Sequence, residues 1–460
     1  MISFKNFFSG ISCERFFLLC CCCLILAVLC SAAYGEEPGG EEPGSPGVKV
    51  YGFLDYSLTG FSYRSESPFL SPSESPDEQM SRYELRLNIE QGMTGKFGFF
   101  TQTVASFNDS SMNDSSGNDT GGESEATGKV RFTQGFFNFR PGTHFFVRIG
   151  KQRISWGRGL AWNPTDFPLE PTKNAIDPED RSGTQNEGVV GLRLELPFRH
   201  VTLAGVYLPE SEGYTERFGA KLELCFWGND LSVSWVHYQD SSETVANGQE
   251  EQSQNLVNQS RGITMFGTDF SRVFGALEMH LEAAWRPKDL RFLPPETAEG
   301  DNSRQQVNPL IEKRDPTWQV STGGSYTFPD ADMMFTFEYF FNGRGLNRSE
   351  SRRFLAALDS PDDGSVRMDV ASLYDPTKFN RHYGVVSLIG LRLLDDFSWS
   401  MTALMNLEDK SFALRPYIEY FPTSRTSVRC EMMLFCGQDD AEFGFIPLRS
   451  QWEIGINFSL

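Results

Sequence analysis

The chain has 460 residues, a formal net charge of -20 at pH 7 and a mean hydropathy of -0.35. A bundle of membrane-spanning helices requires long apolar stretches, and this composition is too polar for one. The acidic excess argues against a nucleic acid as partner. Aromatic residues nevertheless make up 13% of the chain, with 40 Phe, beside 42 Gly. Abundant aromatics at modest hydropathy suit strands that are apolar on one face only.

The N-terminal segment, 1–35, is predicted to be a cleaved signal peptide. Lys5 and Arg15 precede an apolar run over 16–30, and the small residues after it offer a cleavage site. This run is shorter than the roughly 20 residues of a membrane-spanning helix. Lipidation of Cys30, which ends the run, is the alternative to simple cleavage.

The rest of the chain is expected to form one domain, 48–460, preceded by an acidic linker rich in Pro and Gly at 36–47. Six of the nine Cys lie in the signal peptide, so the mature chain retains only Cys225, Cys430 and Cys436. Such a sparse and odd set predicts neither a disulfide framework nor a metal site. We therefore expect no metal and no other cofactor.

Strict alternation of apolar and polar residues is the main structural signal. Residues 83–90, YELRLNIE, place four apolar side chains on one face of a strand and charged or amide groups on the other. The pattern recurs at 218–224, 277–282 and 428–432. About eighteen such segments can be counted, each near the 9 to 11 residues that a tilted strand needs to cross a bilayer. The sequence predicts an all-β, transmembrane, antiparallel up-and-down β-barrel of about 18 strands, with 16 as the alternative.

Tight turns and long loops mostly alternate between the predicted strands, with brief connections on the long side at 209–214 and 408–411 as exceptions. The turns at 141–143 and 228–229 are short, whereas the loops at 157–186 and 343–381 are long. Short periplasmic turns and long extracellular loops are typical of outer-membrane barrels, and a soluble β-sandwich has no reason to gather its long connections at one end. In chain order the predicted strands are 48–62, 81–92, 97–107, 128–140, 144–156, 187–196, 200–208, 215–227, 230–238, 261–270, 275–286, 317–327, 333–342, 382–394, 397–407, 412–421, 426–436 and 450–460.

The charged faces of these strands are expected to point into the barrel. A Lys or Arg on the lipid face costs roughly 2 to 4 kcal/mol at mid-depth, so the polar face must line the interior. The predicted pore-lining residues are Arg82, Glu84, Arg86, Glu90, Arg193, Glu195, Arg217, Lys221, Glu223, Glu278, His280, Glu282, Glu338, Arg392, Arg415, Glu419, Arg429, Glu431 and Glu453.

These inward charges are nearly balanced in sign, so the acidic excess is expected mainly in the linker and in the loops around 108–125, 239–252 and 359–363. Opposed Arg and Glu can line a water-filled pore with a transverse field, or they can form a web of ion pairs in a nearly plugged barrel. A circumference of about eighteen strands favours the pore.

The least random stretch of the chain is 147–167. It is VRIGKQRISWGRGLAWNPTDF, a strand with Gly-Lys-Gln at 150–152 that opens into a Pro-rich loop. This stretch resembles the Gly-Arg/Lys-Gln strand, and the loop after it, of Gram-negative porin-like barrels, which include general porins and alginate-export-type barrels. The resemblance implies an outer-membrane β-barrel and the passage of solutes.

In related porins the loop at this place often folds inward and sets the constriction. The resemblance therefore implies constriction-loop candidates, although an external loop packed on Trp156 and Trp162 is an equal alternative. Apolar and basic residues also exchange faces near Gly150, which predicts a bulge or the membrane rim there. The candidates are Arg153, Arg158, Asp166, Glu170, Lys173, Asp177, Glu179, Asp180 and Arg181.

The last ten residues, QWEIGINFSL, alternate without a slip and place Trp452 and Phe458 on the face expected to meet lipid. They resemble the terminal strand that the barrel-insertion machinery recognises. One departure is that this strand ends in Leu460, where that signal usually ends in Phe.

The predicted function is a porin-like channel for passive diffusion of small hydrophilic solutes, in the outer membrane of a Gram-negative-type bacterium with its loops at the cell surface. A surface adhesin or structural barrel, or a polysaccharide-export barrel, is the alternative. No enzymatic activity is predicted, because His237 shares an apolar face and no catalytic motif stands out. The expected partners are outer-membrane lipid, the insertion machinery and small solutes, with a homotrimer left open and no nucleic acid.

Overall fold

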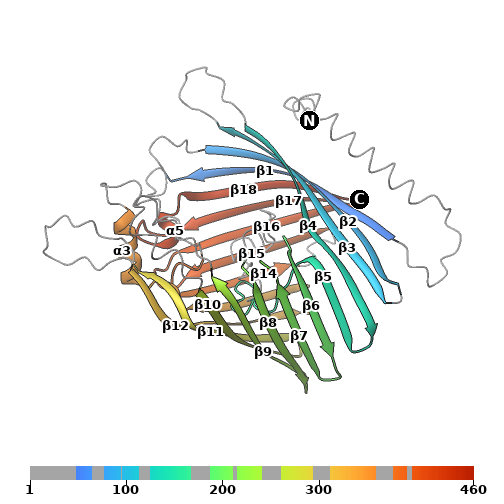
Figure 1. Ribbon diagram of the computed structural model, residues 1–460. Coiled ribbons are helices and arrows are strands. Elements are labelled where there is room, and N and C mark those ends of the chain that lie inside the picture. The colour runs from blue at the N-terminus through green and yellow to red at the C-terminus, as the bar shows by residue number, and fades with distance from the viewer. Residues whose placement is uncertain are drawn as a thin grey trace, which may run out of the picture.

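The computed structural model describes residues 48–64, 77–94, 96–112, 125–166, 187–210, 215–240, 261–293, 311–358, 377–390 and 396–460. Within these residues, 18 antiparallel strands form a single sheet that closes on itself (Figure 1). The predicted fold class and strand number are confirmed. The signal peptide predicted at 1–35 and the linker predicted at 36–47 lie outside the described residues.

The strands run in chain order around the barrel. They are β1 (Val48–Tyr63), β2 (Asp77–Thr94), β3 (Phe97–Met112), β4 (Glu125–Gly142), β5 (Phe145–Gln152), β6 (Val189–Pro197), β7 (Val201–Leu208), β8 (Arg217–Phe226), β9 (Asn229–Asp240), β10 (Arg261–Phe274), β11 (Leu277–Leu293), β12 (Ile311–Phe328), β13 (Met333–Asn342), β14 (His382–Gly390), β15 (Phe397–Asn406), β16 (Phe412–Thr423), β17 (Thr426–Cys436) and β18 (Leu448–Ser459).

The barrel is closed by pairing of β1 with both β2 and β18. The seam between β1 and β18 begins at the pair Phe53 and Ser459, and the N–H of Leu460 donates to the Gly52 carbonyl at 2.9 Å. A closed sheet has no edge strand, so each strand pairs with a neighbour on both of its sides. The terminal strand that the sequence singled out therefore completes the barrel.

Apolar and charged side chains are distributed in the reverse of a water-soluble protein. Large apolar side chains stay exposed on the outer face, among them Phe137 at 66% and Ile149 at 56%. Charged side chains are buried on the inner face, where Asp269 is 1% exposed and Glu282 is 0% exposed. Alternation at period two produces this arrangement, because successive side chains of a strand point to opposite faces.

The connections fall into two sets at opposite ends of the barrel (Figure 1). Tight turns such as 143–144 and 227–228 lie at one end, here called the turn end, together with both ends of the chain that the sheet describes. The opposite end, here called the loop end, carries the long connections 153–188 and 343–381.

β5 ends four residues earlier than predicted. It stops at Gln152, whereas the alternation had extended it to Trp156. The predicted bulge near Gly150 is absent from the β5–β6 pairing, which is regular from Phe146 to Gln152. Gly150 instead has a φ of +128°, a conformation that favours glycine, and a Cβ there would lie 2.3 Å from the Gly135 carbonyl oxygen. The chain therefore leaves the sheet after Gln152, at the rim of the barrel.

Two helices lie at the loop end, where the sequence predicted only loop. They are α3 (Arg348–Leu358) and the short α5 (Glu442–Phe445). Phe354 of α3 and Phe443 of α5 belong to one buried apolar cluster, which also includes Trp162 and Tyr383. Both helices are packed against the barrel wall by this cluster. None of the described helices is long and apolar enough to cross a membrane.

Candidate functional site

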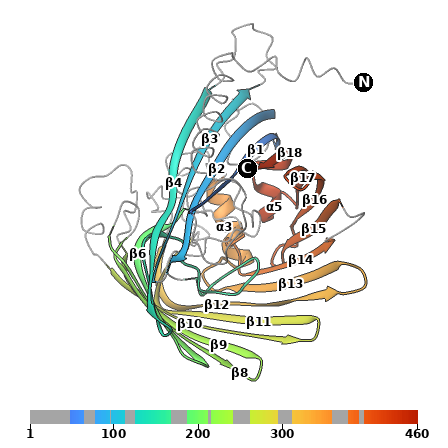
Figure 2. The ribbon, with the colours of Figure 1, turned by 90° about the vertical axis from the view of Figure 1, so that its right-hand side faces the viewer.

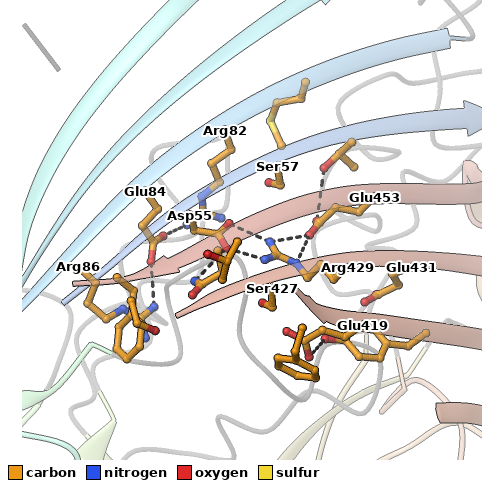
Figure 3. A pocket seen from close by; sticks show the side chains of 18 of the residues that line it. Asp55, Ser57, Arg82, Glu84, Arg86, Glu419, Ser427, Arg429, Glu431 and Glu453 are labelled. Carbon is orange, nitrogen blue, oxygen red and sulfur yellow. Dashed lines mark hydrogen bonds and ion pairs between the residues drawn. The ribbon is translucent and has the colours of Figure 1, made fainter. Parts of the chain in front are cut away.

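An ionic network crosses the seam on the inner face (Figure 3). Arg429 of β17 lies at its centre, and its two Nη atoms donate to Asp55 of β1 at 2.5 and 2.8 Å. Its Nε and one Nη also donate to Glu453 of β18, at 3.1 and 3.0 Å. One guanidinium thus joins the first strand to the last two, and its planar fork suits two carboxylates at once.

A second ionic group continues this network onto β2. Glu84 accepts from Arg82 at 2.5 Å on one oxygen and from Arg86 at 2.9 Å on the other. On the other side of the seam, Arg415 of β16 binds Glu431 of β17 through two hydrogen bonds, of 2.7 and 2.9 Å. Residues from both sides line a common cavity of about 660 Å³, which Figure 3 shows. The cavity wall therefore carries alternating positive and negative charges.

The segment that follows β5 turns into the barrel rather than outward. Figure 2 shows it as a teal trace inside the sheet, passing beside β12 and β13. Residues 161–166 are all buried, and Trp162 is 2% exposed. We call residues 153–166 the inward segment.

Two carboxylates of the barrel wall bind the backbone of the inward segment. Glu282 of β11 accepts from the N–H groups of Arg158 and Gly159. Glu338 of β13 accepts from Leu160 N at 2.5 Å and from Trp162 N at 2.8 Å. The segment has no regular structure here, so its N–H groups need partners of this kind once they leave water. Residues 158–159 are therefore held by β11, and residues 160–162 are held by β13.

Side chains add further contacts between the inward segment and the wall. Lys221 of β8 donates to the Trp156 carbonyl at 2.7 Å and pairs with Asp269 of β10 at 3.4 Å. Arg158 lies between Asp269 and Asp230, at 3.4 and 3.2 Å, and stays 37% exposed. Arg158 is therefore the charged group that this segment presents to the remaining space of the lumen.

Several predicted site residues meet in these two places. The seam cavity is lined by Arg82, Glu84, Arg86, Glu419, Arg429, Glu431 and Glu453. Lys221, Glu282, Glu338 and Arg158 meet at the inward segment, where His280 also contacts Glu338 at 3.1 Å. His280 is among the predicted pore-lining residues, and its partner Glu338 comes from β13.

Other predicted residues lie apart from both places. Arg193 pairs with Glu195 on β6, and the Arg217 guanidinium lies 4.7 Å from the centre of the Tyr238 ring. Glu90 and Glu278 are near the turn end of their strands, on β2 and β11. Two further candidates belong to the inward segment itself: Asp166 accepts from Trp156 N at 2.9 Å, and Arg153 is half-buried. Outside the described residues lie Arg392, Glu170, Lys173, Asp177, Glu179, Asp180 and Arg181.

Some residues of the site were missed by sequence reasoning. Asp55, Ser57 and Thr59 line the seam cavity, and their alternation with Leu54, Tyr56 and Leu58 would have found them. Asp269 of β10 lies on the same face of its strand as Gly267 and Ser271, and the same alternation would have found it. Alternation placed Glu282 and Glu338 on the inner face, but no pattern indicated which backbone groups they bind, because those groups are distant in the sequence.

The side chains that could bind a metal ion are dispersed among the described residues. No group of three or more His, Cys, Asp or Glu in the described ranges is placed to hold a metal ion. His237 contacts the Thr264 hydroxyl at 2.9 Å and stacks on Trp235, which is 39% exposed on the outer face. The three Cys in these ranges are free thiols. What the arrangement does offer is a polar, charged interior within an apolar exterior.

Comparison with known proteins yields similarities of fold only. No protein-family model and no curated protein matches the chain. Among solved structures, OccAB1 of Acinetobacter baumannii is 11% identical with a TM-score of 0.47, covering 92% of this chain and 99% of that one. OccK7 of Pseudomonas aeruginosa is 11% identical with a TM-score of 0.46, covering 90% and 98%. OmpF of Salmonella typhi, in complex with daunomycin, is 9% identical with a TM-score of 0.42, covering 90% and 98%.

Proposed function

We propose that this protein is a porin-like outer-membrane channel through which small hydrophilic solutes diffuse passively. The observation that carries the proposal is the reversed polarity of a closed barrel: Ile149 and Phe137 stay exposed outside, while Glu282 and Asp269 are buried inside. Lipid favours the apolar side chains on the outside, and a hydrated lumen favours the charged side chains on the inside. At 18 strands, the circumference is in the range of barrels that enclose an aqueous channel.

The proposed path runs from the loop end to the turn end past two charged regions. The seam cavity, with Arg429 and its carboxylate partners, forms one region of the wall. The inward segment, with Arg158, narrows the lumen from the strands β8 to β13. A solute passing between these regions meets charges of both signs, which orients polar molecules without binding them tightly.

The positions of the chain ends support the proposed orientation. The chain begins and ends its sheet at the turn end, which we assign to the periplasm, so that the long connections face the cell surface. Insertion through the terminal strand, contact with outer-membrane lipid and assembly as a homotrimer are parts of the same proposal.

A second candidate is a structural or adhesive barrel with a closed lumen. The buried cluster that holds α3, α5 and Trp162 against the wall favours it, since this cluster occupies the loop end. Export of a polysaccharide is less consistent with the interior, because the seam cavity carries both acids and bases where a continuous basic path would be expected.

Electrical recording distinguishes the first two candidates. The full-length protein is purified, refolded and added to planar lipid bilayers in potassium chloride. A channel produces stepwise increases in current, whereas a closed structural barrel leaves the bilayer silent. Heat-denatured protein is the control for leakage that does not depend on the folded barrel.

A further inference from the structure

Glu442 is a fully buried acid at the loop end of the barrel, with 0% of its surface exposed. Three parts of the chain donate hydrogen bonds to its carboxyl group. Thr377 N reaches Oε1 at 2.9 Å, and Tyr383 Oη and Asn406 Nδ2 reach Oε2 at 2.7 and 2.6 Å. One side chain therefore connects α5 to β14, to β15 and to the end of the 343–381 connection.

Among the described residues, no cation forms an ion pair with Glu442. The charged group in contact with it is a second acid, Asp409, whose carboxylate accepts from Glu442 N at 2.7 Å. The other charged groups on the surrounding elements contact different partners. These are Glu408 with His382, Arg381 with Glu350, Arg352 with Asp440, and Arg64 with the carbonyls of Phe435, Ile446 and Leu448, while Asp439 and Lys410 are exposed and Lys378 is half-buried.

The same residues connect Glu442 to the inward segment. Thr377, whose N–H binds Glu442, accepts through its carbonyl from Trp162 Nε1 at 3.2 Å. The Trp162 ring is stacked on Phe340 at 5.2 Å and packs against Tyr383 at 5.8 Å. Glu442 is therefore linked to Trp162 of the inward segment by two routes, one through Thr377 and one through Tyr383.

We propose that Glu442 is a proton-operated latch at the loop end: its neutral carboxyl holds α5, residues 377–381 and the inward segment in one closed arrangement, and loss of the proton releases them and widens the path. The inference rests on the proposed channel function and adds its regulation. A buried carboxylate with no cationic partner is costly, and hydration after release removes that cost.

The direction of the pH effect follows from the two forms of the latch. Burial, helped by the nearby Asp409 carboxylate, raises the pKa of Glu442 to about 8 from its ordinary 4.5 in the closed arrangement. Once released into water, the group returns to its ordinary pKa. Between these two values the closed form retains a proton that the released form has lost, so each pH unit shifts the ratio toward release by up to about tenfold. Below and above this window the ratio no longer changes.

Single-channel recording of the full-length protein over a range of pH tests the latch. For the wild type, we expect the fraction of time in the lower conductance level to fall as the pH rises from about 5 to about 8. The Glu442→Gln variant carries a permanently neutral group of the same shape, so it should stay in the lower level at every pH. The matched control is Asp439→Asn, an exposed acid beside α5, which should respond to pH as the wild type does.

A second variant keeps the test independent of how well Glu442→Gln folds. Tyr383→Phe removes one of the hydrogen bonds that hold the closed arrangement, so release should begin at a lower pH than in the wild type. A channel whose levels do not respond to pH, or a Glu442→Gln channel that responds like the wild type, overturns the latch and leaves the channel function standing. A protein that never conducts overturns both.

Discussion

Carboxylates in the barrel wall bind two different kinds of partner. Asp55 and Glu453 neutralise a guanidinium across the seam, whereas Glu282 and Glu338 accept from backbone N–H groups of the inward segment. Both uses require the acid to be ionised or strongly hydrogen-bonded, because an unsatisfied polar group away from water is costly. The alternation of polar residues predicted that Glu282 and Glu338 point inward, but no pattern in the sequence could tell which backbone groups they would meet.

Arg429 offers a prediction at the scale of one residue. Arg429→Met preserves much of the side-chain volume but leaves Asp55 and Glu453 without their shared cation. We expect a loss of about 1 to 3 kcal/mol in the free energy of unfolding, measured by urea titration of the protein in lipid vesicles. Arg425→Met, at an exposed turn position beside the same cavity, is the control and should unfold like the wild type. Equal stability of both variants would mean that the network does not secure the seam.

The strands are the elements that the sequence predicts well. β13 and β17 begin and end where alternation placed them, and β18 differs from its predicted bounds by only a few residues. The reason is physical: lipid on one face and charge on the other enforce a period of two along each strand. The error at β5 has the same cause, since Ile154 and Trp156 still alternate with polar residues after the exchange of faces near Gly150, although they leave the sheet and pack inside.

The elements inside the barrel were predicted less well. α3 has a local signal that was not used: Asn347 accepts from Ser349 N and Glu350 N, and Glu350 accepts from Asn347 N, which is a capping box. α5 has no such signal, because it is four residues long and is held by burial of Glu442 and Phe443. The inward fold of the loop after β5 was implied only by resemblance, and an external loop remained an equal alternative.

A prediction at the scale of an element concerns the anchoring of the inward segment. Glu338→Ala removes the acceptor for Leu160 N and Trp162 N and also the partner of His280. The segment should detach from β13, and single-channel recordings should show a higher mean conductance with larger current fluctuations. Glu278→Ala, an exposed acid on β11 at the turn end, is the control and should conduct like the wild type. Unchanged current in Glu338→Ala would show that the segment does not limit the lumen.

The whole molecule is organised by two solvents, and a matched pair of substitutions tests this. Met401 is 44% exposed on the outer face of β15, while its neighbour Thr402 contacts Ser387 on the inner face. Met401→Lys places a charge in lipid, with an expected cost of roughly 2 to 4 kcal/mol at mid-depth. Thr402→Lys places the same charge in the lumen and should insert nearly as well as the wild type. The measurement is the folded fraction in lipid vesicles on an unheated gel, and equal yields would contradict the assignment of the two faces.

The central claim is that the barrel encloses an aqueous path between its two ends. Single-channel recording in the presence of neutral polymers of graded size tests it most directly, because a polymer lowers the current only when it enters the lumen. We predict stepwise conductance that small polymers reduce and large polymers leave unchanged. A silent bilayer, or a current that even the smallest polymer does not reduce, would contradict the claim.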